Sequence, residues 1–286
     1  MRRLYLILLT MALVGVSFCL TIGASSQSER QSESPNRFLG FDRNAYPGDE
    51  ALPVLRKTFA FSSYWLGPPP GEKKNSWEGK RALLQEKGFG FLLLFNGQAS
   101  RKLGSADHAY LLGELDAGRA VESASHQGFP PGATIFLDIE EGGRLSSAYH
   151  QYLLAWAKRV KDSGYGPGVY CSAIPVNEGQ GVSITTVQDI QDHLEREKVE
   201  FWVYNDACPP SPGCVFPEKP PAIGQSGYAS AHVWQYAQSP RRKELTTKCA
   251  TSYAGDGNCY APGDTKHKWF LDANVADSAD PSHGRN

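Results

Sequence analysis

We predict an α/β fold for this chain, a TIM-like barrel with five βα units followed by three strands joined by long loops. Three observations favour it. Five short apolar strand patterns alternate with helical patterns from residue 37 onward. Three further strand patterns follow, separated by segments rich in Pro, Gly and Ser. Eight strands in total are enough to close a barrel.

The expected elements follow from hydrophobic periodicity and from turn residues between the runs. The strands are expected at 37–43, 58–65, 89–96, 134–140, 168–173, 200–205, 232–237 and 269–275. The helices are expected at 49–57, 77–87, 107–126, 147–162 and 185–197. The helix at 147–162 has the clearest pattern, because apolar residues repeat at helical spacing along one stripe. These are Tyr149, Tyr152, Leu153, Trp156 and Val160.

The N-terminus has the pattern of an export signal. Met1-Arg2-Arg3 precedes an apolar run that ends in small residues near Ala24. We expect a signal peptide over 1–24, a Ser/Gln/Glu-rich linker over 25–36 and the barrel domain over 37–286, and the apolar run is also long enough to be an uncleaved membrane anchor. The formal net charge of −1 and the lack of a basic run argue against nucleic acid as a partner.

Five cysteines follow the expected signal, and an exported protein can keep disulfides. Cys208 and Cys214 flank one loop, and Cys249 and Cys259 flank another, so we expect these two local pairs. Cys171 lies in an apolar strand pattern and is expected to be a buried thiol. The seven histidines are scattered singly, with no metal-binding spacing, so we expect no metal and no cofactor.

Two acids stand on one face of the fourth expected strand. In the run Phe136-Leu137-Asp138-Ile139-Glu140 both carboxylates point the same way, about 7 Å apart at Cα, because a strand alternates faces with a period of two. Like charges this close do not both ionise freely, so one pKa should rise. A protonated carboxyl beside an ionised one is what glycosidic-bond cleavage requires.

Other polar and aromatic residues are expected at the same rim. The functional face of such a barrel is at the C-terminal ends of its strands, where Asp42 ends the first and Asp272 lies near the end of the eighth. These two strands are neighbours and the fourth faces them, so the four acids should form one cluster. Strands five to seven add groups that suit either sugar contact or barrel core. They are Tyr170, Trp202, Tyr204, Trp234 and Gln235.

The chain resembles two related families. Gly40-Phe41-Asp42, Asp138-x-Glu140, Trp234-Gln235-Tyr236 and Asp272-x-Asn274 resemble the glycoside hydrolase family 25 lysozymes. The closer resemblance is to a bacterial glycoside hydrolase-like barrel family, formerly a domain of unknown function, with an exported mycobacterial cell-wall-associated member. It covers about residues 37–276. The shared features include Tyr46-Pro47-Gly48, Tyr64-Trp65, Asn96-Gly97-Gln98 and Gly168-Val169-Tyr170.

This resemblance implies a role for each acid. Glu140 would be the general acid/base, and Asp138 would orient the substrate N-acetyl group while that group attacks the anomeric carbon, a substrate-assisted retaining mechanism. Asp42 and Asp272 would tune the pair and hold the sugar. Tyr64, Asn96 and Asn274 would join the substrate-binding residues. Glu141 should point away from Glu140 and has no expected catalytic role.

We therefore expect an exported glycoside hydrolase that acts on N-acetylated glycans, with peptidoglycan the first candidate. The alternative is a non-catalytic barrel that binds cell-wall glycan. A metal-dependent deacetylase would group histidines with an aspartate, and no such grouping is evident in the sequence.

Overall fold

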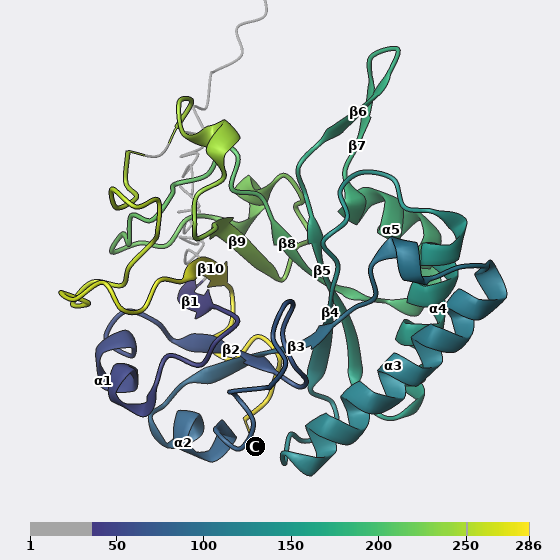
Figure 1. Ribbon diagram of the computed structural model, residues 1–286, viewed down its shortest axis with the longest axis horizontal. Coiled ribbons are helices and arrows are strands. Elements are labelled where there is room, and N and C mark those ends of the chain that lie inside the picture. The colour runs from purple at the N-terminus through teal and green to yellow at the C-terminus, as the bar shows by residue number, and fades with distance from the viewer. Residues whose placement is uncertain (1–35, 250, 286) are drawn as a thin grey trace, which may run out of the picture. The chain divides into compact units, whose positions relative to one another are not determined.

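The computed structural model describes residues 36–249 and 251–285, and their core is a barrel. Its strands are β1 (Phe38–Asp42), β2 (Phe61–Trp65), β3 (Gly90–Asn96), β4 (Thr134–Asp138), β5 (Gly166–Ser172), β8 (Glu200–Tyr204), β9 (Val233–Ala237) and β10 (Asp272–Ala276). They close in the order β1-β10-β9-β8-β5-β4-β3-β2 (Figure 1), which confirms the predicted fold class. The expected signal peptide and residues 25–35 of the expected linker lie outside the described residues.

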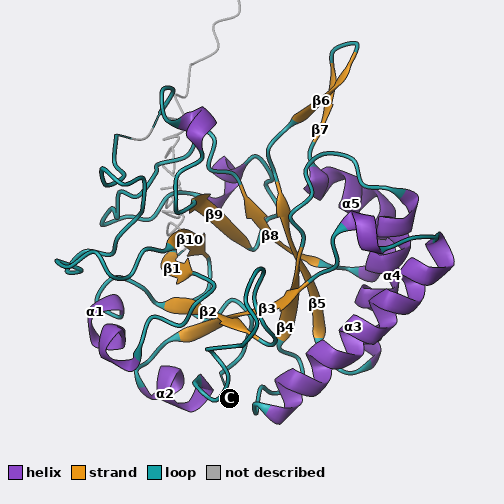
Figure 2. Cartoon of the chain, viewed as in Figure 1, coloured by secondary structure: helices purple, strands orange, loops and turns teal. Residues whose placement is uncertain are grey.

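Helices cover the outside of the barrel (Figure 2). They are α1 (Leu52–Leu55), α2 (Arg81–Glu86), α3 (Ala106–His126), α4 (Ser147–Asp162) and α5 (Thr186–Leu194). Ser105 and Ser146 cap α3 and α4, because each side chain accepts a hydrogen bond from a free N–H of the first turn. Among the helices of the described residues, none combines the length and apolar character that a membrane span requires.

The apolar stripe of α4 attaches this helix to the barrel. All five residues of the predicted stripe are buried, and the Trp156 ring stacks on Phe95 of β3 at 5.6 Å between centroids. Each buried aromatic of this size stabilises the fold by about 1.5–3 kcal/mol. The helix α3 lies alongside α4 (Figure 1), so these two long helices cover one side of the barrel together.

Two features of the strands differ from the prediction. The last barrel strand, β10, runs antiparallel to both β1 and β9, whereas the other neighbouring pairs are parallel. A separate hairpin of β6 (Val176–Gly179) and β7 (Val182–Ile184) projects beyond the barrel (Figure 2). Its residues are exposed or only partly buried, so it lacks the apolar alternation that predicted the other strands.

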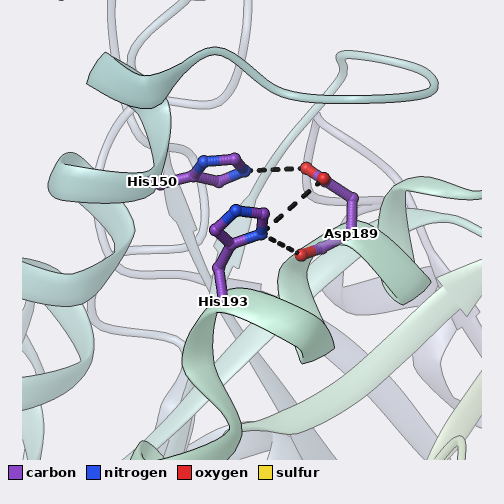
Figure 3. Close-up of side chains that lie close together, drawn as sticks. All are labelled: His150, Asp189 and His193. Carbon is purple, nitrogen blue, oxygen red and sulfur yellow. Dashed lines mark hydrogen bonds and ion pairs between the residues drawn. The ribbon is translucent and has the colours of Figure 1, made fainter.

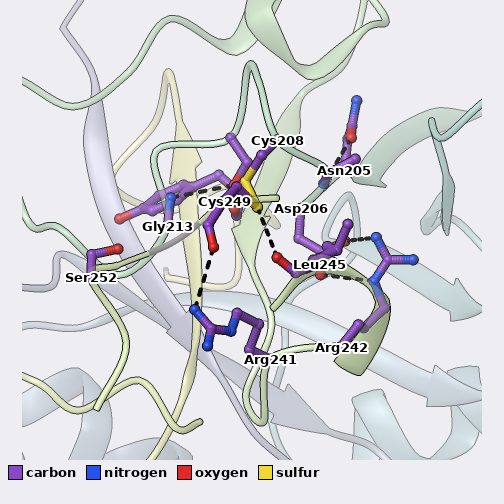
Figure 4. The surroundings of a disulfide bond; sticks show 12 residues. Asn205, Asp206, Cys208, Gly213, Arg241, Arg242, Leu245, Cys249 and Ser252 are labelled. Carbon is purple, nitrogen blue, oxygen red and sulfur yellow. Dashed lines mark hydrogen bonds and ion pairs between the residues drawn. A yellow bond between two sulfur atoms is a disulfide. The ribbon is translucent and has the colours of Figure 1, made fainter. Parts of the chain in front are cut away.

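The disulfides join different loops, so the expected local pairs are wrong. Cys208 pairs with Cys249 (Figure 4) and Cys214 with Cys259, with Cα atoms 5.4 and 5.5 Å apart. The loop after β8 lies against the loop after β9, which places each cysteine opposite one of the other loop. Each bond closes a long stretch, with separations of 41 and 45 residues, and so restricts the unfolded chain more than a local pair would. Cys171 is a buried free thiol, as predicted.

Peptide mapping under non-reducing conditions should recover Cys208 joined to Cys249 and Cys214 joined to Cys259. Replacing both Cys208 and Cys249 with Ala should lower the free energy of unfolding by about 2–4 kcal/mol, because the unfolded chain regains the entropy of an open loop. Urea denaturation would measure the loss. A peptide linking Cys208 to Cys214 would contradict this pairing.

Candidate active site

The strand ends place four acids on one rim of the barrel. Asp42 ends β1, Asp138 ends β4 and Glu140 follows two residues later. Asp272 does not lie near the end of its strand as expected, because it is the first residue of β10. Since β10 is antiparallel, its beginning lies at the rim where the parallel strands end, and Asp272 pairs with Asp42 in the register.

The Asp42 carboxylate is held by two buried amides. Its Oδ2 accepts hydrogen bonds from Asn274 Nδ2 at 2.6 Å and from Gln235 Nε2 at 2.9 Å. The other end of each amide is bonded as well. Asn274 Oδ1 accepts from Trp202 Nε1 at 2.9 Å, and Gln235 Oε1 accepts from the Tyr170 hydroxyl at 2.8 Å. These five side chains form one hydrogen-bonded network inside the barrel.

Two residues just after β9, Gln238 and Ser239, complete this network, although they were not among the predicted site residues. The backbone N–H of Ser239 donates to Asp272 Oδ1, and Gln238 Nε2 donates to Gln235 Oε1 at 3.1 Å. Gln235 Nε2 also lies 3.5 Å from Asp272 Oδ2. The available signal was the position of Gln238 and Ser239, which follow the Trp-Gln-Tyr motif after one residue, Ala237.

Asp138 and Glu140 share a hydrogen bond between their carboxyl groups. Burial raises the pKa of Asp138 well above its usual value, and the charges of Glu140 and Asp42 raise it further. Desolvation also raises the pKa of Glu140, but its hydrogen bond with Asp138 opposes the shift. Burial thus favours the protonated form of Asp138 more strongly than that of Glu140, which is exposed at the rim.

Burial also raises the pKa values of the other two acids, Asp42 and Asp272. It raises the pKa of Asp42 to about 6, although the amides of Asn274 and Gln235 lower it and so limit the shift. The pKa of Asp272 is raised well above its usual value by desolvation and by the charge of Asp42. The charges of Asp42 and Glu140 thus contribute to the raised pKa values of both Asp138 and Asp272.

Several predicted sugar-binding residues lie at this rim. Asn96 ends β3 and pairs with Asp138, and a Cβ at the next residue, Gly97, would lie 2.5 Å from the Asp138 carbonyl oxygen. Only glycine therefore allows this close approach of the two strands. Tyr204 is partly exposed, and its ring lies 5.3 Å from that of Tyr170. Gln235, Asn274 and Trp202 are buried and bonded within the network, so they position the acids.

Tyr64 and Trp234 do not join the site, contrary to expectation. Tyr64 is fully buried against Phe129 and bonds to Gln127, which follows α3, so it lies in the layer between barrel and helices. Trp234 is also fully buried, and its Nε1 donates to the Asn205 carbonyl at 3.0 Å. Gln235 points into the barrel, so alternation turns Trp234 outward.

A cavity of about 280 Å³ lies beside Asp272. Arg43 and Phe270 line it, with the guanidinium 5.1 Å from the ring centroid, and the Phe270 side chain is 40% exposed. Burial lowers the pKa of Arg43, and the charges of Asp264 and Asp272 oppose this shift. Arg43 directly follows Asp42, but it was not among the predicted site residues.

One grouping lies away from the rim. His150, Asp189 and His193 gather on α4 and α5, so the expectation that no histidines are grouped with an aspartate is wrong. The signal was the spacing of Asp189 and His193, four residues apart on one helix, which places both side chains on the same face.

Comparison with known proteins identifies the family of this chain. A family model for the Rv2525c-like, glycoside hydrolase-like domain matches residues 68–211. The chain belongs to this family. The matched segment runs from the loop after β2 to the loop after β8 and includes Asp138 and Glu140. No curated protein matches the chain.

The chain is similar to several solved structures. An uncharacterized protein from B. stearothermophilus is 17% identical, with a TM-score of 0.57 over 84% of this chain and 95% of that one. The Tat-secreted protein Rv2525c of Mycobacterium tuberculosis is 16% identical, with a TM-score of 0.49 over 88% and 98%. A bacterial lysozyme from Streptomyces coelicolor is 13% identical, with a TM-score of 0.48 over 86% and 94%. The likeness to the B. stearothermophilus protein supports the fold of this chain and, at 17% identity, nothing about its function.

The free energy of unfolding should fall as pH rises from about 4 to 6. Over this range the folded state keeps the Asp42 proton, whose pKa rises from 3.8 to about 6, while the unfolded state releases it. The raised pKa values of Asp138 and Asp272 act in the same direction. Asp272→Asn should therefore reduce the slope and stabilise the protein at pH 7 by about 1–2 kcal/mol.

Urea denaturation across this pH range would measure the slope. The control is Asp277→Asn, which removes the same charge at an exposed position next to β10 and should leave the slope unchanged. An Asp272→Asn variant with the slope of the wild type would contradict this account.

Proposed function

We propose that the protein is an exported glycoside hydrolase that cleaves N-acetylated glycans, with peptidoglycan as the expected substrate. The observation that carries this proposal is the carboxyl pair Asp138–Glu140 at the C-terminal end of β4, where burial raises the pKa of both acids, Asp138 is buried and Glu140 is exposed at the rim. Membership of a glycoside hydrolase-like family supports the same reaction class.

In the proposed mechanism Glu140 is the general acid. The proton on Asp138 passes to Glu140 along their hydrogen bond, and Glu140 then gives it to the leaving glycosidic oxygen. The ionised Asp138 holds the N–H of the substrate acetamido group, whose carbonyl oxygen attacks the anomeric carbon as the glycosidic bond breaks. The attack forms a cyclic intermediate in which the acetamido oxygen is bonded to the anomeric carbon. Glu140 then takes a proton from a water molecule, and the water oxygen attacks the anomeric carbon and opens this ring, so the configuration there is retained.

Asp42 and the two amides bonded to it favour the protonated form of Asp138 from which the proposed reaction starts. The charge of Asp42 helps keep the proton on Asp138, and Gln235 and Asn274 keep the Asp42 carboxylate in place. Asp272 and Tyr170 lie beside Asp42 and Gln235 in the same site, and we propose that they orient the sugar. The side-chain amides of Gln235 and Asn274 are already bonded to Asp42. Among the predicted substrate-binding residues, we therefore propose the partly exposed Asn96 and Tyr204 as the direct contacts.

The cavity beside Asp272 is the proposed seat for a neighbouring sugar. Its volume is near the lower end of the range for ligand pockets. The exposed ring of Phe270 offers a flat apolar surface for a pyranose, and Arg43 lies within reach of an acidic substituent. Two interloop disulfides support an oxidising, extracytoplasmic location.

Glu140→Gln should reduce the release of reducing ends from purified peptidoglycan by at least about a hundredfold, because Gln cannot donate the proton. The control is Glu122→Gln, which makes the same change at an exposed position on α3 and should retain the wild-type rate. Urea denaturation should show that all three proteins are folded, with neither variant less stable than the wild type.

Pull-down with insoluble peptidoglycan separates this function from the alternative. Glu140→Gln should still bind the glycan. A wild type that binds the glycan but releases no reducing ends would be a non-catalytic binding barrel, and the hydrolase proposal would then be wrong. Full activity in Glu140→Gln would contradict the assigned mechanism.

A further inference from the structure

Two helices on the outside of the barrel bring together two imidazoles and a carboxylate (Figure 3). His150 Nε2 of α4 lies 2.8 Å from Asp189 Oδ2 of α5. One turn later on α5, His193 Nδ1 lies 3.7 Å from Asp189 Oδ1 and 2.7 Å from the Asp189 carbonyl oxygen. The two imidazole rings stack with centroids 3.5 Å apart, and the bonded nitrogen of each faces the aspartate.

These ligand atoms suit a divalent transition metal. Zn²⁺ takes imidazole nitrogen and carboxylate oxygen at about 2.0–2.2 Å, which places ligand atoms about 3.3 Å apart in a tetrahedral site. One potential ligand atom from each of the three residues lies within 4.8 Å of the others. The distance of 2.8 Å from His150 Nε2 to Asp189 Oδ2 and that of 3.7 Å from His193 Nδ1 to Asp189 Oδ1 each differ from this spacing by roughly half an ångström. We propose that His150, Asp189 and His193 form a Zn²⁺ site.

The surroundings of Asp189 resemble the outer shell of a metal site. The Asp189 side chain is fully buried, and its Oδ2 accepts from the Leu145 N–H at 2.9 Å. Such a bond fixes the orientation of a ligating carboxylate. Arg144 lies 3.4 Å from Oδ1, but Glu178 binds the same guanidinium with two contacts of 2.9 Å and offsets its charge.

One side of the grouping is open. The His193 side chain is 42% exposed, whereas that of His150 is 13% exposed. An ion can therefore enter past His193, and water can supply the fourth ligand. On binding, His193 Nδ1 would exchange its hydrogen bond to the Asp189 carbonyl for the metal, and the two rings would tilt from their stack.

A metal ion here would act as a clamp. It would join α4 to α5, and Asp189 in turn holds the loop that follows Glu140, through Leu145. Thr186, at the start of α5, donates to the Glu141 carbonyl of the same loop at 3.2 Å. The bound ion would thus stabilise the fold beside the rim without touching the four acids.

Isothermal titration of the chelator-treated full chain with ZnCl₂ tests this site. The wild type should bind one equivalent, and His193→Ala should weaken binding by about a hundredfold or more, since loss of an outer-shell partner alone costs ten- to a hundredfold. His126→Ala removes an exposed histidine from α3 and should bind as the wild type does. His193 is exposed enough for its variant to fold, and the far-ultraviolet circular dichroism of the three proteins should agree.

Thermal unfolding provides a second readout. At a hundredfold excess of Zn²⁺ over its dissociation constant, the midpoint should rise by about 5 °C in the wild type and in His126→Ala, and not in His193→Ala. No Zn²⁺ binding, or equal binding by His193→Ala and the wild type, would overturn the proposal. Glu140→Gln should bind Zn²⁺ normally, so this result and the test of hydrolysis are independent.

Discussion

The Asp42 carboxylate, held between the amides of Asn274 and Gln235, is the interaction on which the rest of the site depends. It joins β1 to β10 and β9, three strands that meet where the barrel closes. A buried carboxylate without these donors would cost several kcal/mol, so the register that aligns Asp42 with Asp272 is strongly favoured over a slipped one. The pairing of β1 with β10 that closes the barrel therefore also places Asp42 beside Asp272.

The low-dielectric surroundings of the four carboxyl groups lower the stability of the fold and raise the pKa values of these groups. Four carboxyl groups with raised pKa values weaken the fold near neutral pH, because the unfolded chain ionises them more easily. The network limits this cost by placing hydrogen-bond donors around Asp42 and Asp272 and a shared proton between Asp138 and Glu140. A barrel built only for stability would carry apolar side chains at these positions, so the acids are more consistent with a functional role.

The sequence was sufficient for the strand order and for the rim position of the acids, because alternation and turn residues report which segments are strands. It did not reveal the direction of β10, since an alternating pattern reads the same in both directions. Asp272 lies at the predicted rim because it begins an antiparallel strand, whereas it was expected near the end of a parallel one. Alternation also shows that Trp234 and Gln235 face opposite ways, but not which of them faces the barrel interior, and cysteine spacing carries no information on how two distant loops pack.

Glu140 combines an exposed side chain with a restrained backbone. The preceding Ile139 N–H donates to the Tyr170 carbonyl at 3.0 Å, and Glu141 is bonded through its side chain to Ser100 and through its carbonyl to Thr186. The backbone on both sides of Glu140 is therefore bonded to neighbouring elements, while Glu140 itself is exposed. A general acid needs this combination, because its oxygen must meet the glycosidic bond within a few tenths of an ångström. A purely structural acid at the rim would need only one of the two properties.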